Sequence, residues 1–148
     1  MNEASKEKIA ILEKEGFYLS APSGSSMRPA ICGGKDQALI VPLIGKAKKG
    51  DVLLYEDAKG AHVLHRVIKV TESGYLLRGD NRYYSEAVPF DKVIGILSAI
   101  FKGDKKIDCQ KSVRYRLYSK RRMLTYPVRR LGAAVRLRLR RRHTRRLP

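Results

Sequence analysis

Three residue types that recur in hydrolase active sites follow one another along this chain of 148 residues. Ser26 stands in the glycine- and proline-containing run Ser23-Gly24-Ser25-Ser26-Met27-Arg28-Pro29, His65 in an apolar run, and Asp80 in Gly79-Asp80-Asn81-Arg82. A serine hydroxyl is a poor nucleophile unless a neighbouring base activates it, and histidine titrates near neutral pH. The order serine, histidine, aspartate therefore indicates a hydrolase that works by acyl transfer.

Each of these residues also has a purely structural interpretation. A single histidine is more often a core or surface residue than a base, and an aspartate after glycine is common in turns. His62 and His65 differ by three positions, so they point to opposite faces of a regular strand and cannot readily share a metal ion. His65 shares its face with Val63 and Val67, where its imidazole would be partly desolvated. The combination with Ser26 favours the catalytic interpretation.

The surrounding pattern predicts a mostly β domain. Residues 5–15 read as a short helix that Ser5 caps and Gly16 ends. Short apolar runs separated by glycine-containing turns then predict strands at 39–44, 52–55, 62–70, 75–78, 93–101 and 105–109. Pro42 suggests an edge or a bulge in the first of them. Strands at this spacing, without helices between them, indicate an antiparallel arrangement.

Four sequence boxes in this order resemble those of the signal peptidase I family and its LexA-type relatives. Gly24-Ser25-Ser26-Met27-Arg28-Pro29 resembles the nucleophile box, and Lys49-Gly50-Asp51-Val52-Leu53-Leu54 a box that leads into a strand. Leu64-His65-Arg66-Val67-Ile68 resembles the box of the general base, and Gly79-Asp80-Asn81-Arg82-Tyr83-Tyr84-Ser85 the box that follows it. Gly95 falls where the family has its next glycine. The resemblance covers residues 20–100 and implies a signal peptidase-like catalytic β domain.

The resemblance also implies roles for individual residues. Ser26 takes the place of the nucleophile, and His65 takes the place where most bacterial members have lysine, as in the endoplasmic-reticulum and archaeal type. Asp80 takes the place of an aspartate that orients or stabilises the base. The family's second aspartate is missing here or replaced by Glu86 or Asp91.

The oxyanion donors follow less directly from the resemblance. The backbone N–H of Ser26 is one expected donor. Gly24 stands where related chains have a serine hydroxyl, so the second donor is expected from Ser23 or Ser25. Arg82, in the turn after Asp80, is a further supporting residue.

Charge divides the chain into a catalytic domain at 1–110 and a basic extension at 111–148. The first part has 17 Lys and Arg against 14 Asp and Glu, whereas the second has 15 and no acidic residue. Leu124, Val128, Leu131, Val135 and Leu139 recur at helical spacing, which predicts an amphipathic segment, helical or disordered. We expect it to bind an anionic membrane surface. Nucleic acid is a less favoured partner, and a solvated tail or a protein partner is the remaining alternative.

The composition bears on compartment and cofactors. Cys32 and Cys109, far apart and without paired spacing, predict separate thiols rather than a zinc site or a bridge. The sequence contains no run of about twenty apolar residues, so it predicts no membrane span. The N-terminus also lacks the apolar stretch of a secretory signal. We therefore expect a cytoplasmic chain, peripheral on the membrane, with no metal or cofactor.

The functional expectation is a serine endopeptidase similar to signal peptidase I that processes a precursor peptide or protein. Signal-peptide cleavage fits less well, because the family's transmembrane anchor is not found beside the nucleophile box. LexA-like self-cleavage is a further alternative, although histidine replaces its lysine base. The alternative from another functional class is a non-catalytic binding protein that retains the peptidase fold.

Overall fold

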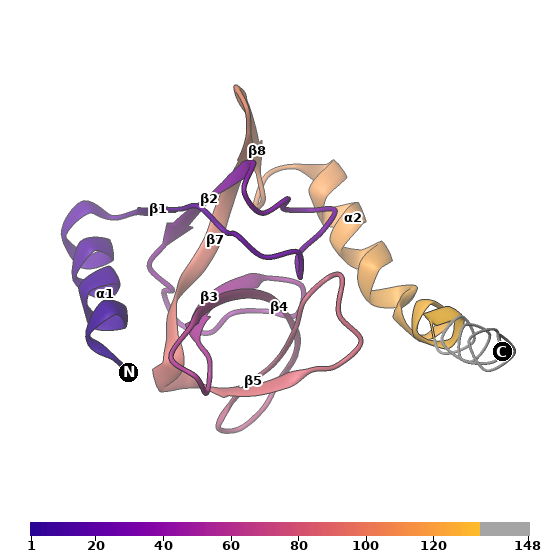
Figure 1. The fold of residues 1–148 in the computed structure, drawn as a ribbon, viewed down its shortest axis with the longest axis horizontal. Helices are drawn as coiled ribbons and strands as arrows, with labels where there is room; N and C mark the ends of the chain where they lie inside the picture. Colours follow the sequence, from indigo (N-terminus) through magenta and orange to yellow (C-terminus); the bar gives the residue numbers. More distant parts are fainter. Residues whose placement is uncertain (134–148) are drawn as a thin grey trace, which may run out of the picture.

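The computed structural model describes residues 1–133 and confirms a mostly β, antiparallel chain (Figure 1). Its elements, in order, are α1 (Glu3–Glu15), β1 (Tyr18–Ser20), β2 (Asp36–Val41), β3 (Val52–Glu56), β4 (His62–Val70), β5 (Gly74–Arg78), β6 (Glu86–Pro89), the 3-10 turn η1 (Phe90–Lys92), β7 (Val93–Lys102), β8 (Lys105–Asp108) and α2 (Val113–Leu124). In Figure 1, α1 and α2 lie on opposite sides of the strands.

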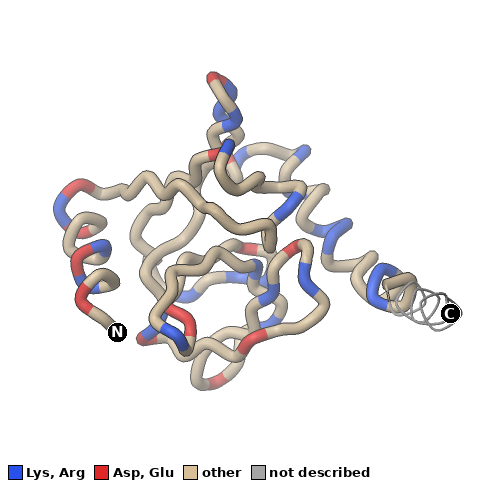
Figure 2. The backbone as a smooth tube through the Cα atoms, viewed as in Figure 1, with Lys and Arg blue, Asp and Glu red and all other residues tan. Residues whose placement is uncertain are grey.

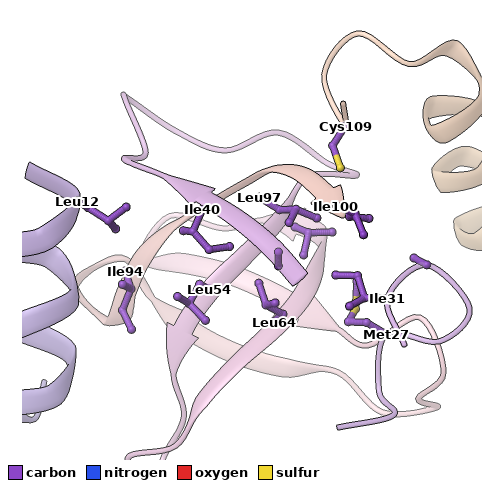
Figure 3. Close-up of a cluster of buried hydrophobic side chains, with 13 residues drawn as sticks. Leu12, Met27, Ile31, Ile40, Leu54, Leu64, Ile94, Leu97, Ile100 and Cys109 are labelled. Carbon is purple, nitrogen blue, oxygen red and sulfur yellow. The ribbon is translucent and has the colours of Figure 1, made fainter. Parts of the chain in front are cut away.

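One antiparallel sheet organises the molecule, with strand order β1-β2-β7-β3-β4-β5-β6 and β8 paired to β7. Every residue of β3 is buried, because apolar side chains cover both of its faces. Leu54 belongs to a first core with Leu12 of α1, which Figure 3 shows, and Leu53 to a second core with Val67 and Leu77. Strand β4 pairs with β3 along its first half. Side chains of β4 therefore also face one or the other of these two cores.

The N-terminal helix begins earlier than predicted, and its cap is Asn2 rather than Ser5. The Asn2 side chain accepts a hydrogen bond from the Ser5 N–H at 2.9 Å. Ser5 lies inside the helix and is buried, because its hydroxyl donates to Glu56 of β3 at 2.6 Å and lies 2.8 Å from His62 Nε2. The capping pattern was misread because Ser5 serves a tertiary contact that the local sequence does not reveal. Gly16 ends the helix in the left-handed conformation, as predicted.

The strand predictions differ from the structure mainly in the first strand and in two short edges. β2 spans Asp36–Val41 rather than 39–44 and stops directly before Pro42, whose ring nitrogen cannot donate to the sheet. Neither β1 nor β6 was predicted, because three or four residues are too few to show alternation. Both are outer strands of the sheet.

The basic extension begins as a helix that packs on the domain. Ser112 caps α2, and residues 126–133 continue as helix after a turn at Thr125. Ser119 is buried, and Tyr115 and Tyr118 pack against the first core. The predicted apolar positions Val135 and Leu139 lie outside the described residues.

Two further findings concern membrane-spanning helices and the cysteines. Within residues 1–133 no helix combines the length and the apolar character needed to cross a membrane. Cys32 and Cys109 are free thiols, which agrees with the prediction that they do not form a bridge.

Candidate active site

Two apolar anchors hold the turn that carries Ser26. Met27 and Ile31, directly after Ser26, are buried in the first core (Figure 3). The Ile31 N–H donates to the Met27 carbonyl at 3.0 Å, which closes the turn. Gly33 lets the chain pack back on itself, because a Cβ at that position would lie 2.2 Å from the Gly24 carbonyl oxygen. Ser26 itself remains half-buried at the surface.

Strand β4 buries His65 on the face predicted from strand alternation. Its partner across the pair is Leu53, and its side chain lies with those of Tyr55 and Val67 on the second core. His62, three residues earlier, contacts Ser5 of α1 instead. The two histidines therefore have different hydrogen-bond partners, and His65 Nε2 lies near Gly79, which packs on the Ser26 carbonyl.

A chain of hydrogen bonds fixes the His65 ring. Its Nδ1 lies 2.9 Å from the Tyr55 hydroxyl, which donates to Glu86 Oε2 at 2.7 Å. Because the hydroxyl proton goes to Glu86, the Tyr55 oxygen accepts the proton of Nδ1. His65 is therefore the tautomer whose Nε2 carries a lone pair, the form that a general base requires. Glu86 Oε1 also lies 3.9 Å from Nδ1, within reach of an imidazolium.

The electrostatic surroundings keep His65 neutral. Burial lowers the pKa of His65 below its ordinary value, the carboxylate of Glu86 opposes this by raising that pKa, and the Arg82 guanidinium lowers it again. Asp80 also raises the pKa of His65, and its effect is the smallest of the four. Burial, followed by the adjacent Glu86, raises the pKa of Tyr55, so the phenol stays protonated as the hydrogen-bond chain requires. A buried, neutral imidazole can accept a proton at neutral pH.

Gly79 is the contact point between His65 and the Ser26 turn. A Cβ on Gly79 would lie 2.7 Å from the Ser26 carbonyl oxygen and 3.0 Å from His65 Nε2. The backbone of Gly79 therefore packs closely against both. Only glycine allows this approach, since real Cβ atoms do not come within 3.0 Å of backbone oxygen.

Within residues 1–133 no hydrogen bond joins the Asp80 carboxylate to His65. Its carboxylate binds Arg66 in a bidentate pair, with both N–O distances 2.7 Å, and accepts from the Tyr118 hydroxyl at 2.9 Å. Arg66 is 1% exposed and also donates to the Gly50 carbonyl and the Ser119 hydroxyl. The orienting contact expected of Asp80 is made instead by Tyr55 and Glu86. Asp80 ties the strand of His65 to helix α2.

A cleft of about 690 Å³ runs past these groups. Among the residues that line it are Ser23, Gly24, Ser26, His65, Arg82 and Glu86. Ser23 lines the cleft and Ser25 does not, which favours Ser23 as the second oxyanion donor. Among residues 1–133 no backbone acceptor engages the N–H of Ser26, so that N–H can serve as the first donor. Of the two carboxylates left open by the sequence, Glu86 rather than Asp91 faces His65.

Two absences complete the geometry of the described chain. Within residues 1–133 no hydrogen bond joins the Ser26 hydroxyl to His65, although both line the same cleft. In the same residues no group of three or more histidine, cysteine or carboxylate side chains gathers in a way that could hold a metal ion.

Sequence reasoning missed Tyr55 as the residue whose hydroxyl contacts His65 Nδ1. The signal was present in part: Tyr55 and His65 lie on neighbouring strands, and both point to the face of Leu53. Choosing Tyr55 required the register Tyr55↔Val63, which the sequence does not fix. Gly33 was also missed, because a close backbone approach is visible only in three dimensions.

A scan against protein-family models finds no matching family, and a search of curated proteins finds no similar sequence.

Proposed function

We propose that the protein is a serine endopeptidase similar to signal peptidase I, with Ser26 as nucleophile and His65 as general base. The observation that carries the proposal is the orientation of His65: its Nδ1 proton goes to Tyr55, backed by Glu86, and its Nε2 lies against the Gly79 contact with the Ser26 turn. The antiparallel sheet supports the finer interpretation as a signal peptidase-like β domain.

Peptide hydrolysis would proceed in two halves. His65 Nε2 takes the hydroxyl proton as Ser26 Oγ attacks the scissile carbonyl, and the new oxyanion is stabilised by the Ser26 N–H with Ser23 beside it. His65 then gives the proton to the leaving amine, which departs and leaves an acyl-enzyme. Water, deprotonated by the same nitrogen, hydrolyses the ester and restores Ser26. The step requires Oγ to come within hydrogen-bond distance of Nε2 when substrate binds.

Glu86 and Tyr55 would stabilise the imidazolium that forms in each half. Glu86 Oε1 is 3.9 Å from Nδ1, and the Tyr55 oxygen is 2.9 Å from it. A carboxylate that faces Nδ1 through a phenol places negative charge where positive charge develops, without itself taking the proton. The substrate class is a peptide or protein segment that fits an open cleft, such as a precursor to be processed.

A serine-directed acylating probe tests the proposal. We expect covalent labelling at Ser26, lost in Ser26→Ala and reduced by at least about a hundredfold in rate in His65→Ala, because the base contribution is removed. Ser25→Ala is the matched control, since this neighbouring hydroxyl does not line the cleft. Labelling that persists in Ser26→Ala, or that is unchanged in His65→Ala, contradicts the assignment.

A second candidate function is a non-catalytic binding protein with this fold. The observation that favours it is the missing hydrogen bond between the Ser26 hydroxyl and His65 in residues 1–133. It predicts that folded protein gives no labelling with any acylating probe, yet still binds peptides in the cleft.

A further inference from the structure

Helix α2 and its continuation present an apolar stripe to solvent. Five large apolar residues on this helix are exposed: Val113 (66%), Leu117 (61%), Leu124 (79%), Val128 (73%) and Leu131 (68%). Their spacing of 4, 7, 4 and 3 residues places them within an arc of about 60° at 100° per residue. Exposed apolar residues scattered singly are ordinary, but a continuous stripe of this length marks an interaction site.

The stripe is not needed to hold the helix on its own domain. The opposite face does that: Tyr118 donates to Asp80, the Ser119 hydroxyl accepts from Arg66, and the Tyr126 hydroxyl donates to the Tyr83 carbonyl at 2.7 Å. The helix therefore has two distinct faces, one that packs on the strands and one that no part of residues 1–133 covers. Figure 1 shows the helix at the edge of the molecule.

Positive charge flanks the stripe on both sides. On the helical wheel Arg114 and Arg121 lie along one margin, and Arg116 and Lys120 along the other. Figure 2 shows basic residues and no acidic ones along α2. Across residues 1–133 no salt bridge engages these four side chains.

Two lysines of the β domain add positive charge beside the margin formed by Arg116 and Lys120. Lys48 and Lys49, in the turn before β3, line a cavity of about 430 Å³ together with Arg116 and Lys120. Four cations and one carboxylate, that of Asp51, thus line one hollow beside the stripe. Such an arrangement attracts anionic groups that lie in the plane of the apolar face.

We propose that this helix docks on the surface of an anionic bilayer, with the stripe in the acyl boundary and the flanking cations on the lipid headgroups. Amphipathic helices with an apolar face and basic margins bind in this way. A second copy of the chain fits less well, because two helices of the same charge would repel each other. Nucleic acid would use the cations but would leave the five apolar residues in water.

Docking would also place the proposed active site beside the membrane. The inner face of the same helix holds Asp80 and Tyr83, so this turn would lie about one helix diameter, roughly 10 Å, from the lipid. This consequence rests on the proposed function, whereas the docking itself does not.

Vesicle sedimentation of the full-length chain tests the proposal without reference to activity. We expect binding to vesicles of phosphatidylcholine with phosphatidylglycerol, and much weaker binding to phosphatidylcholine alone. Leu117→Ser/Leu124→Ser/Val128→Ser should weaken binding to the anionic vesicles at least about tenfold, because apolar area no longer leaves water. Ile44→Ser is the matched control, since Ile44 is 94% exposed in the loop between β2 and β3.

Three outcomes overturn the proposal. The first is wild-type protein that does not bind the anionic vesicles. The second is a triple variant that binds as well as wild type, which would assign binding to charge alone. The third is wild-type protein that forms dimers without lipid and a triple variant that is monomeric, which would assign the stripe to a second copy. If the triple variant does not melt like wild type, Val113→Ser/Leu131→Ser at the ends of the stripe replaces it, with the same expected loss of binding.

Discussion

The carbonyl oxygen of Ser26 accepts a hydrogen bond of 2.7 Å from the backbone N–H of Asn81. This bond joins two turns that lie 55 positions apart in the chain, one with the proposed nucleophile and one with Gly79 and Asp80. The Asn81 side chain adds a longer contact of 3.4 Å to the Ser25 carbonyl. The position of Ser26 therefore depends on the turn after β5 as much as on its own residues.

Gly79→Ala should damage the site through this junction. The added Cβ would meet the Ser26 carbonyl oxygen at 2.7 Å and His65 Nε2 at 3.0 Å, so the two turns must separate. Overpacking of this kind costs about 1–3 kcal/mol of unfolding free energy. Displacing the nucleophile should also slow Ser26 acylation at least about tenfold. Thermal unfolding and labelling kinetics measure the two effects.

Gly24→Ala is the structural control for that variant, because a Cβ on Gly24 meets nothing within 4 Å. Its melting temperature should equal that of wild type. If Gly79→Ala also melts and reacts like wild type, the close approach of the two turns is not required for the site.

The rate of Ser26 acylation should rise with pH along an acid limb that follows the protonation of His65. Burial lowers the pKa of His65, so the limb should lie below the ordinary titration of histidine, with the rate at its plateau at neutral pH. Rates measured across pH with one acylating probe test this. A limb that lies above the ordinary histidine value would contradict a buried, neutral base.

Glu86→Gln and Arg82→Gln should move that limb in opposite directions. The Glu86 carboxylate raises the pKa of His65, so its removal lowers the pKa and shifts the limb to lower pH. The Arg82 guanidinium lowers the same pKa, so its removal shifts the limb to higher pH. Titration of the His65 imidazole by NMR measures both shifts directly. Shifts of the same sign in the two variants would contradict at least one of these two assignments.

Sequence reasoning predicted the mostly β fold class, which the structure confirms, because that class depends on local patterns. Alternation along 62–70 was sufficient to separate His62 from His65. It failed where the answer depended on tertiary contact: Ser5 was read as a cap although Glu56 binds it, and Asp80 was expected beside His65 although Arg66 holds it. His65 and Arg66 are neighbours in one box, and Asp80 stands in another. The sequence does not show which of the two Asp80 contacts until β4 and the turn after β5 are placed.

Asp80→Asn should destabilise the protein more than it disturbs the base. It removes one partner of a buried bidentate pair and leaves Arg66 at 1% exposure without its counter-charge. Breaking such a pair costs about 3–5 kcal/mol of unfolding free energy. Since Asp80 has the smallest effect on the pKa of His65, the acid limb should move less than in Glu86→Gln. Denaturant unfolding gives the first quantity and the pH profile the second.

A combined replacement separates structure from catalysis at this position. Arg66→Met/Asp80→Leu removes both charges and should recover much of the stability that Asp80→Asn loses, because no unpaired buried charge remains. An Asp80→Asn variant as stable as wild type would mean that the pair contributes little, and the role of Asp80 would then have to lie in the reaction.

A chain shortened to residues 1–110 should fold poorly, although charge alone would place a boundary there. It loses α2, whose Ser119 and Tyr118 cover Arg66 and Asp80 and whose Arg122 donates to the Asp80 carbonyl. It also loses Arg129, in the helical residues that follow α2, which donates to the same carbonyl. The buried ion pair would then face water, and the turn that fixes Ser26 would lose its outer support. A chain shortened to residues 1–133 keeps all of these contacts and should melt at least about 5 °C higher than 1–110. Equal melting temperatures would show that the domain ends before α2 and that the helix only rests on it.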